Sequence, residues 1–194
     1  MVHRKNITGI ILAGGKSSRI GTDKGFLKLN GKPFVQYSID ALQPLVNDII
    51  IVSDILDYDI FGLKRIDDLT KNSGPIAGIC SGLRASLTEC NLILSCDIPL
   101  IKTEVLQKLI DHIDDVTQVI QVESQGKSMP LIALYKKEVL NTFESLLKND
   151  ERRLRVAIKA CNSKNIVVEK KNQYSVMNVN TQTELIAVEN AYNH

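Results

Sequence analysis

Several features that would mark common protein classes are missing from this sequence of 194 residues. It has no run of ~18 apolar residues, so no membrane-spanning helix is expected. Lys and Arg total 24 against 22 Asp and Glu, and a net charge of only +2 argues against a general nucleic-acid-binding protein. The four cysteines form no CxxC pair, which excludes the usual pattern of a zinc site or disulfide framework. We therefore expect reduced thiols in a cytoplasmic protein.

What the chain does contain is an alternation of short β-rich runs and longer amphipathic segments. Strands are expected at 7–12, 48–53, 91–96, 117–122, 131–135 and 165–168. Helices are expected at 33–45, 75–87, 103–113 with Thr103 as N-cap, 136–147, and after Asn180. The charge-dense segment 148–155 is read as a loop or an exposed helix start. The alternation predicts an α/β fold with a largely parallel sheet, and the length suits one domain over residues 1–194.

The expected sheet indicates which side of the molecule would bind a ligand. Ligands of open α/β sheets bind beyond the carboxyl ends of the strands. The loops that follow Leu12, Ser53 and Cys96 should therefore share one edge. We expect the functional site there.

The loop after the first strand has the composition of a phosphate-binding loop. It contains four glycines and several cations: Gly14, Gly15, Gly21 and Gly25, with Lys16, Arg19, Lys24 and Lys28. Glycines let backbone N–H groups approach phosphate oxygens closely, and Arg19 and Lys24 add mobile positive charge. A surface turn with solubilising lysines is the alternative, and it fits poorly with so many glycines directly after a buried strand.

Two common phosphate loops do not match this segment. A Walker A motif would need glycine where Ile10 stands, and no GxGxxG dinucleotide fingerprint is present. Further along, Asp97 directly follows the strand at 91–96. A carboxylate at that position can hold Mg²⁺, which takes one or two carboxylates together with phosphates and water. The alternative is that Asp97 caps the next helix.

Residues 12–33, LAGGKSSRIGTDKGFLKLNGKP, closely resemble the opening signature of the molybdenum cofactor guanylyltransferases. The resemblance implies transfer of GMP from GTP to the terminal phosphate of molybdopterin, with release of pyrophosphate and Mg²⁺ as cofactor. It also implies a three-layer α/β/α sandwich, the Rossmann-like nucleotidyltransferase fold, with one antiparallel strand in a mostly parallel sheet.

Later segments extend the resemblance along nearly the whole chain. Asp68 followed by Gly74-Pro75-Ile76-Ala77-Gly78 resembles the family's Asp…GPLAG segment, although Asp67 could be the equivalent aspartate. The other matching segments are Cys96-Asp97-Ile98-Pro99, 129–135 (MPLIALY), Arg152-Arg153-Leu154 and Asn178-Val179-Asn180-Thr181. Gln182-Thr183 replaces the family's Pro-Glu, but Thr181 can still cap the last helix.

The resemblance implies a set of site residues. The implied catalytic residues are Arg19, Lys24 and Asp97, and Asp97 is also the implied metal ligand. Nucleotide binding falls to Leu12, Ala13, Gly14, Gly15, Lys24, Ser53, Asp68, Gly78 and Asp97. Molybdopterin binding falls to Asn178, Asn180 and Arg153. Implied partners besides the two substrates are molybdenum-insertion and molybdoenzyme-maturation proteins, with neither nucleic acid nor membrane.

Three other functions stay open at this point. A molybdopterin cytidylyltransferase typically has alanine where this chain has Gly14, which favours guanine. Another small nucleotidyltransferase shares the glycine-rich loop, but the segment around Asn178 and Asn180 counts against it. A non-catalytic GTP-binding protein would be expected to have lost Lys24 or Asp97.

Overall fold

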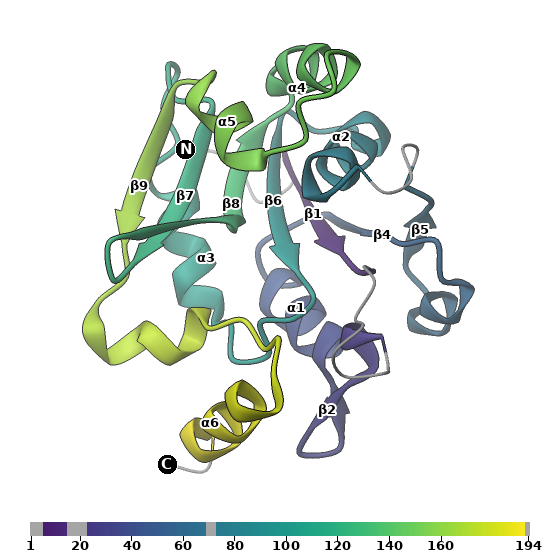
Figure 1. Ribbon diagram of the computed structural model, residues 1–194, viewed down its shortest axis with the longest axis vertical. Coiled ribbons are helices and arrows are strands. Elements are labelled where there is room, and N and C mark those ends of the chain that lie inside the picture. Colours follow the sequence, from purple (N-terminus) through teal and green to yellow (C-terminus); the bar gives the residue numbers. More distant parts are fainter. Residues whose placement is uncertain (1–5, 15–22, 69–72, 193–194) are drawn as a thin grey trace.

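A computed structural model describes residues 6–14, 23–68 and 73–192, which are built around a seven-stranded sheet (Figure 1). The strand order is β5-β4-β1-β6-β8-β7-β9. The strands are β1 (Ile7–Leu12), β4 (Asp48–Val52), β5 (Lys64–Ile66), β6 (Cys90–Ser95), β7 (Val119–Ser124), β8 (Lys127–Lys136) and β9 (Ser163–Val167). Only β8 runs antiparallel to its neighbours in this sheet. The expected mostly parallel sheet with one antiparallel strand is confirmed.

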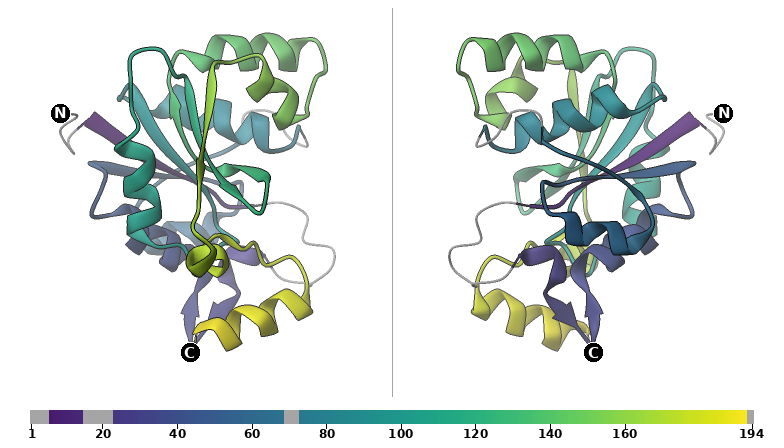
Figure 2. Two further views of the ribbon diagram at one scale, coloured as in Figure 1. Left: turned by 90° about the vertical axis from the view of Figure 1, so that its left-hand side faces the viewer. Right: turned by 90° about the vertical axis from the view of Figure 1, so that its right-hand side faces the viewer.

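Helices cover both faces of the sheet, which gives the expected three layers (Figure 2). They are α1 (Phe34–Leu42), α2 (Pro75–Ala85), α3 (Thr103–Ile110), α4 (Val139–Lys148), α5 (Leu154–Lys159) and α6 (Gln182–Tyr192). α1 and α3 pack on one face, and α2, α4 and α5 on the other. No helix in the described part of the chain is long and apolar enough to span a bilayer.

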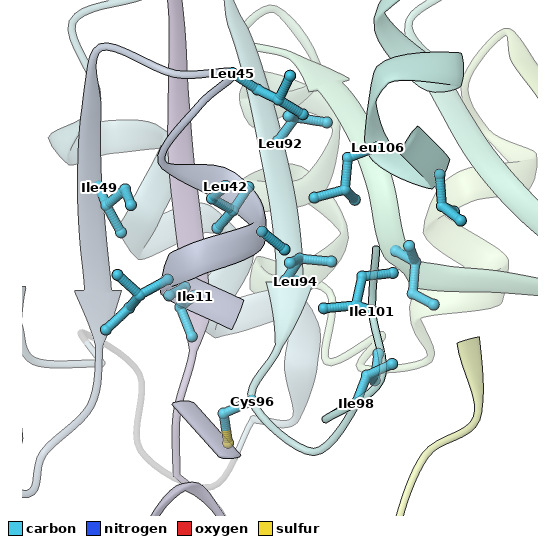
Figure 3. Packing of buried hydrophobic residues seen from close by; sticks show 14 of the residues in the cluster. Ile11, Leu42, Leu45, Ile49, Leu92, Leu94, Cys96, Ile98, Ile101 and Leu106 are labelled. Carbon is cyan, nitrogen blue, oxygen red and sulfur yellow. The ribbon is translucent and has the colours of Figure 1, made fainter. Parts of the chain in front are cut away.

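The central strand β1 is buried on both faces, as its continuous apolar run predicts. Ile11 lies in the cluster beneath α1 and α3, where Leu42 and Leu106 also lie (Figure 3). Ile10 points to the other face, into the cluster beneath α2. The two faces of one strand thus join both halves of the core.

Helix α2 approaches β1 closely because glycines face the strand. A Cβ on Gly82 would lie 2.5 Å from Ile10 Cγ2, and one on Gly78 would lie 3.3 Å from Leu12 Cδ2. Gly78, the last residue of the matching segment 74–78, therefore has a packing role that the sequence motif alone did not predict.

The chain reverses its direction of travel across the sheet at β1. From β1 it passes through α1 to β4 on one side, and it returns through α2 to β6 on the other. Leu12 is in register with both Val52 and Ser95, so the strands β1, β4 and β6 end together. The shared edge expected for these loops is confirmed, and it is the switch point at which open α/β sheets bind ligands.

Some boundaries differ from the expectations for identifiable reasons. β8 is longer than 131–135 because a register shift in its pairing with β7 lets it continue past Pro130, a residue that sheets tolerate at bulges. α4 starts only at Val139 because β8 runs to Lys136. Thr103 is not an N-cap: it is the first residue of α3, and its hydroxyl donates to the Ala41 carbonyl at 3.1 Å.

Three strands were not expected because they are too short to show a period. They are β5, which has three residues, and the two-residue strands β2 (Lys28–Leu29) and β3 (Lys32–Pro33), which form a hairpin. The hairpin region packs beside α6 (Figure 1) through Leu29, Phe34, Val179 and Val188. The charge-dense segment 148–155 ends in a helix start, since α5 begins at Leu154.

The four cysteines are free thiols, as expected from their spacing. Cys80, Cys90 and Cys96 are buried, and Cys161 is half-buried. Burial raises the pKa of Cys80 to about 12, which keeps it protonated at neutral pH.

Candidate active site

Asp97 lies at the end of β6, where the β1–β6 pairing continues by one bond from Cys96 N to the Leu12 carbonyl at 3.1 Å. Its side chain is only 8% exposed. Asp97 Oδ1 accepts a hydrogen bond from Ser95 Oγ at 2.7 Å. The next helix, α3, begins at Thr103, so Asp97 does not cap it. The carboxylate is instead held at the sheet edge.

Lys24 reaches this carboxylate from the loop after β1. It is the first residue of a short 3₁₀-helix, Lys24–Phe26, and its Nζ lies 3.0 Å from Asp97 Oδ2. The same ammonium donates to Asn180 Oδ1. Three segments far apart in the sequence are thereby brought together by one cation.

The start of α6 fixes the position of Asn180. Thr181 Oγ1 accepts from Glu184 N at 3.2 Å, so Thr181 does cap the helix, despite the altered sequence at Gln182-Thr183. Glu184 Oε2 in turn accepts from Asn180 N at 2.7 Å. This reciprocal pair resembles a capping box and holds the backbone beside Lys24.

Four of the residues expected at the nucleotide, Leu12, Ala13, Gly14 and Ser53, lie at the carboxyl ends of β1 and β4. Ala13 N donates to the Val52 carbonyl at 3.0 Å. Gly14 has φ +138°, a conformation that disfavours any side chain, and a Cβ there would lie 3.5 Å from Ser53 Oγ. Gly15 and Arg19 lie outside the described residues.

The two candidate aspartates after β5 have different surroundings. Asp67 Oδ1 lies 2.5 Å from Arg65 Nη1, and the Asp67 side chain is 68% exposed. Asp68 Oδ1 instead accepts from Ser81 Oγ of α2 at 3.3 Å. Asp67 thus pairs with the arginine of the preceding strand, whereas Asp68 turns toward α2.

A cavity of about 920 Å³ is lined in part by Asn180, the residue that accepts from Lys24. Its lining includes all three residues expected at molybdopterin: Arg153, Asn178 and Asn180. The cavity is also lined by two cations, Lys127 and Arg155. Its apolar lining includes Ile98, Met129, Leu131, Ile132 and Val176. Arg153 is ion-paired with Glu151, with Nε 2.8 Å from Oε1, and this contact lowers the pKa of Glu151 to about 2.

A family model described as a MobA-like NTP transferase domain matches residues 9–165. The chain belongs to the MobA-like NTP transferase family. A Flavobacterium johnsoniae protein named "Probable molybdenum cofactor guanylyltransferase" is 35% identical over 93% of this chain and 95% of its own length. A Vibrio vulnificus protein named molybdenum cofactor guanylyltransferase is 31% identical over 91% of each chain.

Solved structures show the same fold for this MobA-like chain. Molybdopterin-guanine dinucleotide biosynthesis protein A from Archaeoglobus fulgidus superposes with a TM-score of 0.79 at 23% identity, covering 96% of this chain and 98% of that one. A CMP:2-keto-3-deoxy-manno-octonic acid synthetase superposes with a TM-score of 0.75 at 15% identity, covering 97% and 99%. The nucleotidyltransferase fold expected from the sequence is confirmed.

Sequence reasoning missed several residues of this MobA-like site. Ser95 and Glu184 hold Asp97 and Asn180, and Tyr58 contacts Asp23, the neighbour of Lys24. Each acts through a hydrogen bond to a motif residue, and only some of these contacts have a signal in local sequence spacing. Glu184 stands three residues after Thr181, the spacing of a capping box, and Ser95 stands two residues before Asp97, whereas nothing in local spacing signals the contact of Tyr58.

Proposed function

We propose that this protein transfers GMP from GTP to the terminal phosphate of molybdopterin, which releases pyrophosphate and forms the guanine dinucleotide cofactor. The observation that carries the proposal is the contact of Lys24 with both Asp97 and Asn180 at the switch point of the sheet. Asn180 also lines the cavity, so it connects the lysine to a second binding space. The named relatives support the choice of reaction, since they match over nearly their full length.

On the nucleotide side, the proposal places GTP over the ends of β1 and β4. Gly14 leaves room there for close approach of a base or ribose, and Ser53 Oγ lies beside that position. Asp68, which accepts from Ser81, is proposed to supply a second polar group to the nucleotide. Lys24 would bind the triphosphate, and Gly15 and Arg19, which lie outside the described residues, stay predicted to bind it as well. The glycine at position 14 supports GTP over CTP.

The donor set at Asp97 suits Mg²⁺. A carboxylate offers about four lone-pair sites, and Asp97 uses two of them, for Ser95 and Lys24. No group of three or more His, Cys, Asp or Glu side chains gathers within the described residues, so the remaining ligands would be phosphate oxygens and water, as Mg²⁺ prefers. Bound there, Mg²⁺ would offset phosphate charge.

The reaction needs charge neutralisation more than acid–base catalysis. A phosphate monoester has a second pKa of ~6 and is mostly dianionic at neutral pH, so the acceptor needs no general base. Each pair of unit charges at ~4 Å repels by ~4 kcal/mol at an effective dielectric of 20. Lys24 lies where it can reduce this repulsion. His112, the only histidine among the described residues, contacts the Lys108 carbonyl and does not line the cavity.

On the acceptor side, the cavity supports binding of molybdopterin. Its volume of about 920 Å³ falls in the ~300–1,000 Å³ range of small-molecule sites. Asn178 and Asn180 offer amide groups, and Arg153 offers a cation for phosphate. Molybdenum-insertion and molybdoenzyme-maturation proteins stay predicted partners, and residues 1–194 are proposed to act as one domain.

Calorimetric titration with GTP, CTP, ATP and UTP in the presence of Mg²⁺ tests the proposal, followed by an assay of GMP transfer to molybdopterin. We expect selective GTP binding and release of pyrophosphate that depends on molybdopterin. A preference for CTP would favour the cytidylyltransferase alternative. GTP binding without transfer would favour a non-catalytic protein, and absence of nucleotide binding would contradict the proposal.

A further inference from the structure

A completely buried tyrosine contacts the segment that carries Lys24. Tyr58 belongs to a 3₁₀-helix, Leu56–Phe61, that follows β4, and it has 0% exposure. Its hydroxyl donates to Asp23 Oδ1. Burial raises the pKa of Tyr58 far above its usual value, so the hydroxyl keeps its proton. No residue of this 3₁₀-helix belongs to the motifs that define the site.

Asp23 connects Tyr58 to the backbone next to Lys24 by accepting hydrogen bonds from both. The same Oδ1 accepts from Gly25 N at 3.0 Å and thereby caps the 3₁₀-helix that begins at Lys24. A Cβ on Gly25 would lie 2.1 Å from the Tyr58 hydroxyl, so only glycine permits this approach. The ring of Phe26 lies 4.6 Å from that of Tyr58. The backbone is therefore held on both sides of the lysine.

We propose that Tyr58 is a positioning residue that acts through Asp23 to aim Lys24 at the triphosphate. Together, Asp23, Gly25 and Tyr58 form what we call the lysine clamp. This inference rests on the proposed function, because it takes the triphosphate to be the partner of Lys24.

A lysine in this place needs such support. Its four-carbon stem is flexible, and only its tip is held by Asp97 and Asn180. Phosphate groups arriving at the site would compete with those two partners for the ammonium. The clamp then fixes where the stem starts, and a misplacement of about 1 Å at a reacting centre can cost ~10²-fold in rate.

Tyr58→Phe tests the clamp because it removes the hydroxyl and keeps the ring. The variant is made in the wild-type protein and in Lys24→Ala, and all four proteins are compared in a double-mutant cycle. The readouts are the Kd of GTP with Mg²⁺ and, with molybdopterin, kcat/KM for GTP. Tyr37→Phe is the matched control, since the Tyr37 hydroxyl donates to the Leu29 carbonyl at 2.8 Å and not to the clamp.

We expect Tyr58→Phe to weaken GTP binding and lower kcat/KM by about tenfold in the wild-type background. In the Lys24→Ala background we expect a change of less than twofold, because the lysine through which Tyr58 acts is gone. Tyr37→Phe should resemble the wild type, and the unfolding midpoint of Tyr58→Phe should show that the fold is retained. Asp23→Ala should reproduce the Tyr58→Phe loss and its dependence on Lys24.

Equal losses in both backgrounds would overturn the proposal, since Tyr58 would then act on the fold in general. An unchanged Kd and kcat/KM in Tyr58→Phe would overturn it as well. If the wild type binds GTP but transfers no GMP, the proposed function fails. The double-mutant cycle measured on the Kd of GTP still tests whether Tyr58 positions Lys24. If the wild type binds no nucleotide, both fail.

Discussion

Lys24 and Asp97 lie 73 positions apart in the sequence, and their side chains form an ion pair of 3.0 Å at the carboxyl edge of the sheet. The lysine side chain is 24% exposed and the aspartate side chain 8% exposed, so the pair is shielded yet reachable from solvent. Because the same lysine also donates to Asn180, each partner's position depends on the other two. Substitutions in this group should therefore affect substrate binding more than folding.

Lys24→Ala removes the cation that we place at the triphosphate. A hydrogen bond to a charged group is commonly worth ~1.5–3 kcal/mol, so we expect the Kd of GTP to rise by about 10- to 150-fold. Calorimetric titration with GTP and Mg²⁺ measures this. Lys32→Ala is the matched control, because that lysine forms an exposed ion pair with Asp40. An unchanged Kd in Lys24→Ala would remove this residue from the nucleotide site.

Asp97→Asn keeps the size of the side chain and removes the charge proposed to hold Mg²⁺. We expect kcat for GMP transfer to fall by ~10²–10³-fold, as is typical when one electrostatic stabiliser is lost. The rate should be measured against Mg²⁺ concentration, with circular dichroism as a check of the fold. Asp40→Asn, at the exposed pair with Lys32, should retain full activity. Turnover near the wild-type rate in Asp97→Asn would refute the metal assignment.

Arg153→Ala should separate the two substrates. Arg153 lines the cavity and is held by Glu151, so its loss should raise KM for molybdopterin several-fold and leave the Kd of GTP within twofold. Steady-state kinetics with each substrate varied in turn gives both values. Arg84→Ala, which breaks an ion pair with Glu144 outside the cavity lining, serves as control. A selective effect on GTP would place Arg153 on the nucleotide side instead.

Gly82→Ala should lower stability through overpacking against β1. The new Cβ would lie 2.5 Å from Ile10 Cγ2. Overpacking costs ~1–3 kcal/mol, which exceeds the gain of ~1 kcal/mol in helix propensity. Gly78→Ala, with its nearest contact at 3.3 Å, should stay within about 1 kcal/mol of the wild type. Urea unfolding compares the two, and equal stabilities would show that α2 can move away from the strand.

Motif order and strand periodicity predicted much of this protein. The run 7–12 predicted a buried central strand, and the glycines and cations after it predicted a phosphate loop. The expectation that Leu12, Ser53 and Cys96 lead into one edge followed from the parallel order of their strands. These features depend on local composition or on general rules of α/β sheets, so they can be predicted from a single sequence.

Other features depend on which segments meet. The sequence could not distinguish Asp67 from Asp68, because they are adjacent and identical. The structure shows that Asp68 contacts Ser81 of α2 and that Asp67 contacts Arg65. The lysine clamp joins Asp23 to Tyr58, 35 positions away; Asp23 caps one short 3₁₀-helix and Tyr58 belongs to another, and neither segment has a recognisable periodicity. A hydrogen bond between distant side chains leaves no spacing rule in the chain, because its geometry is set by how the intervening elements pack.

The amino-acid order was therefore enough to predict the layered α/β fold and the edge at which the strands end together, since both follow from periodicity and from the order of the strands; the chemistry of that edge stays a prediction. Packing decided which aspartate, serine and tyrosine support that edge, and it placed Asn180 between the lysine and the cavity. The physical reason is that backbone periodicity is local, whereas the position of a side chain in a site is fixed by long-range contacts that form only when the sheet and its covering helices come together.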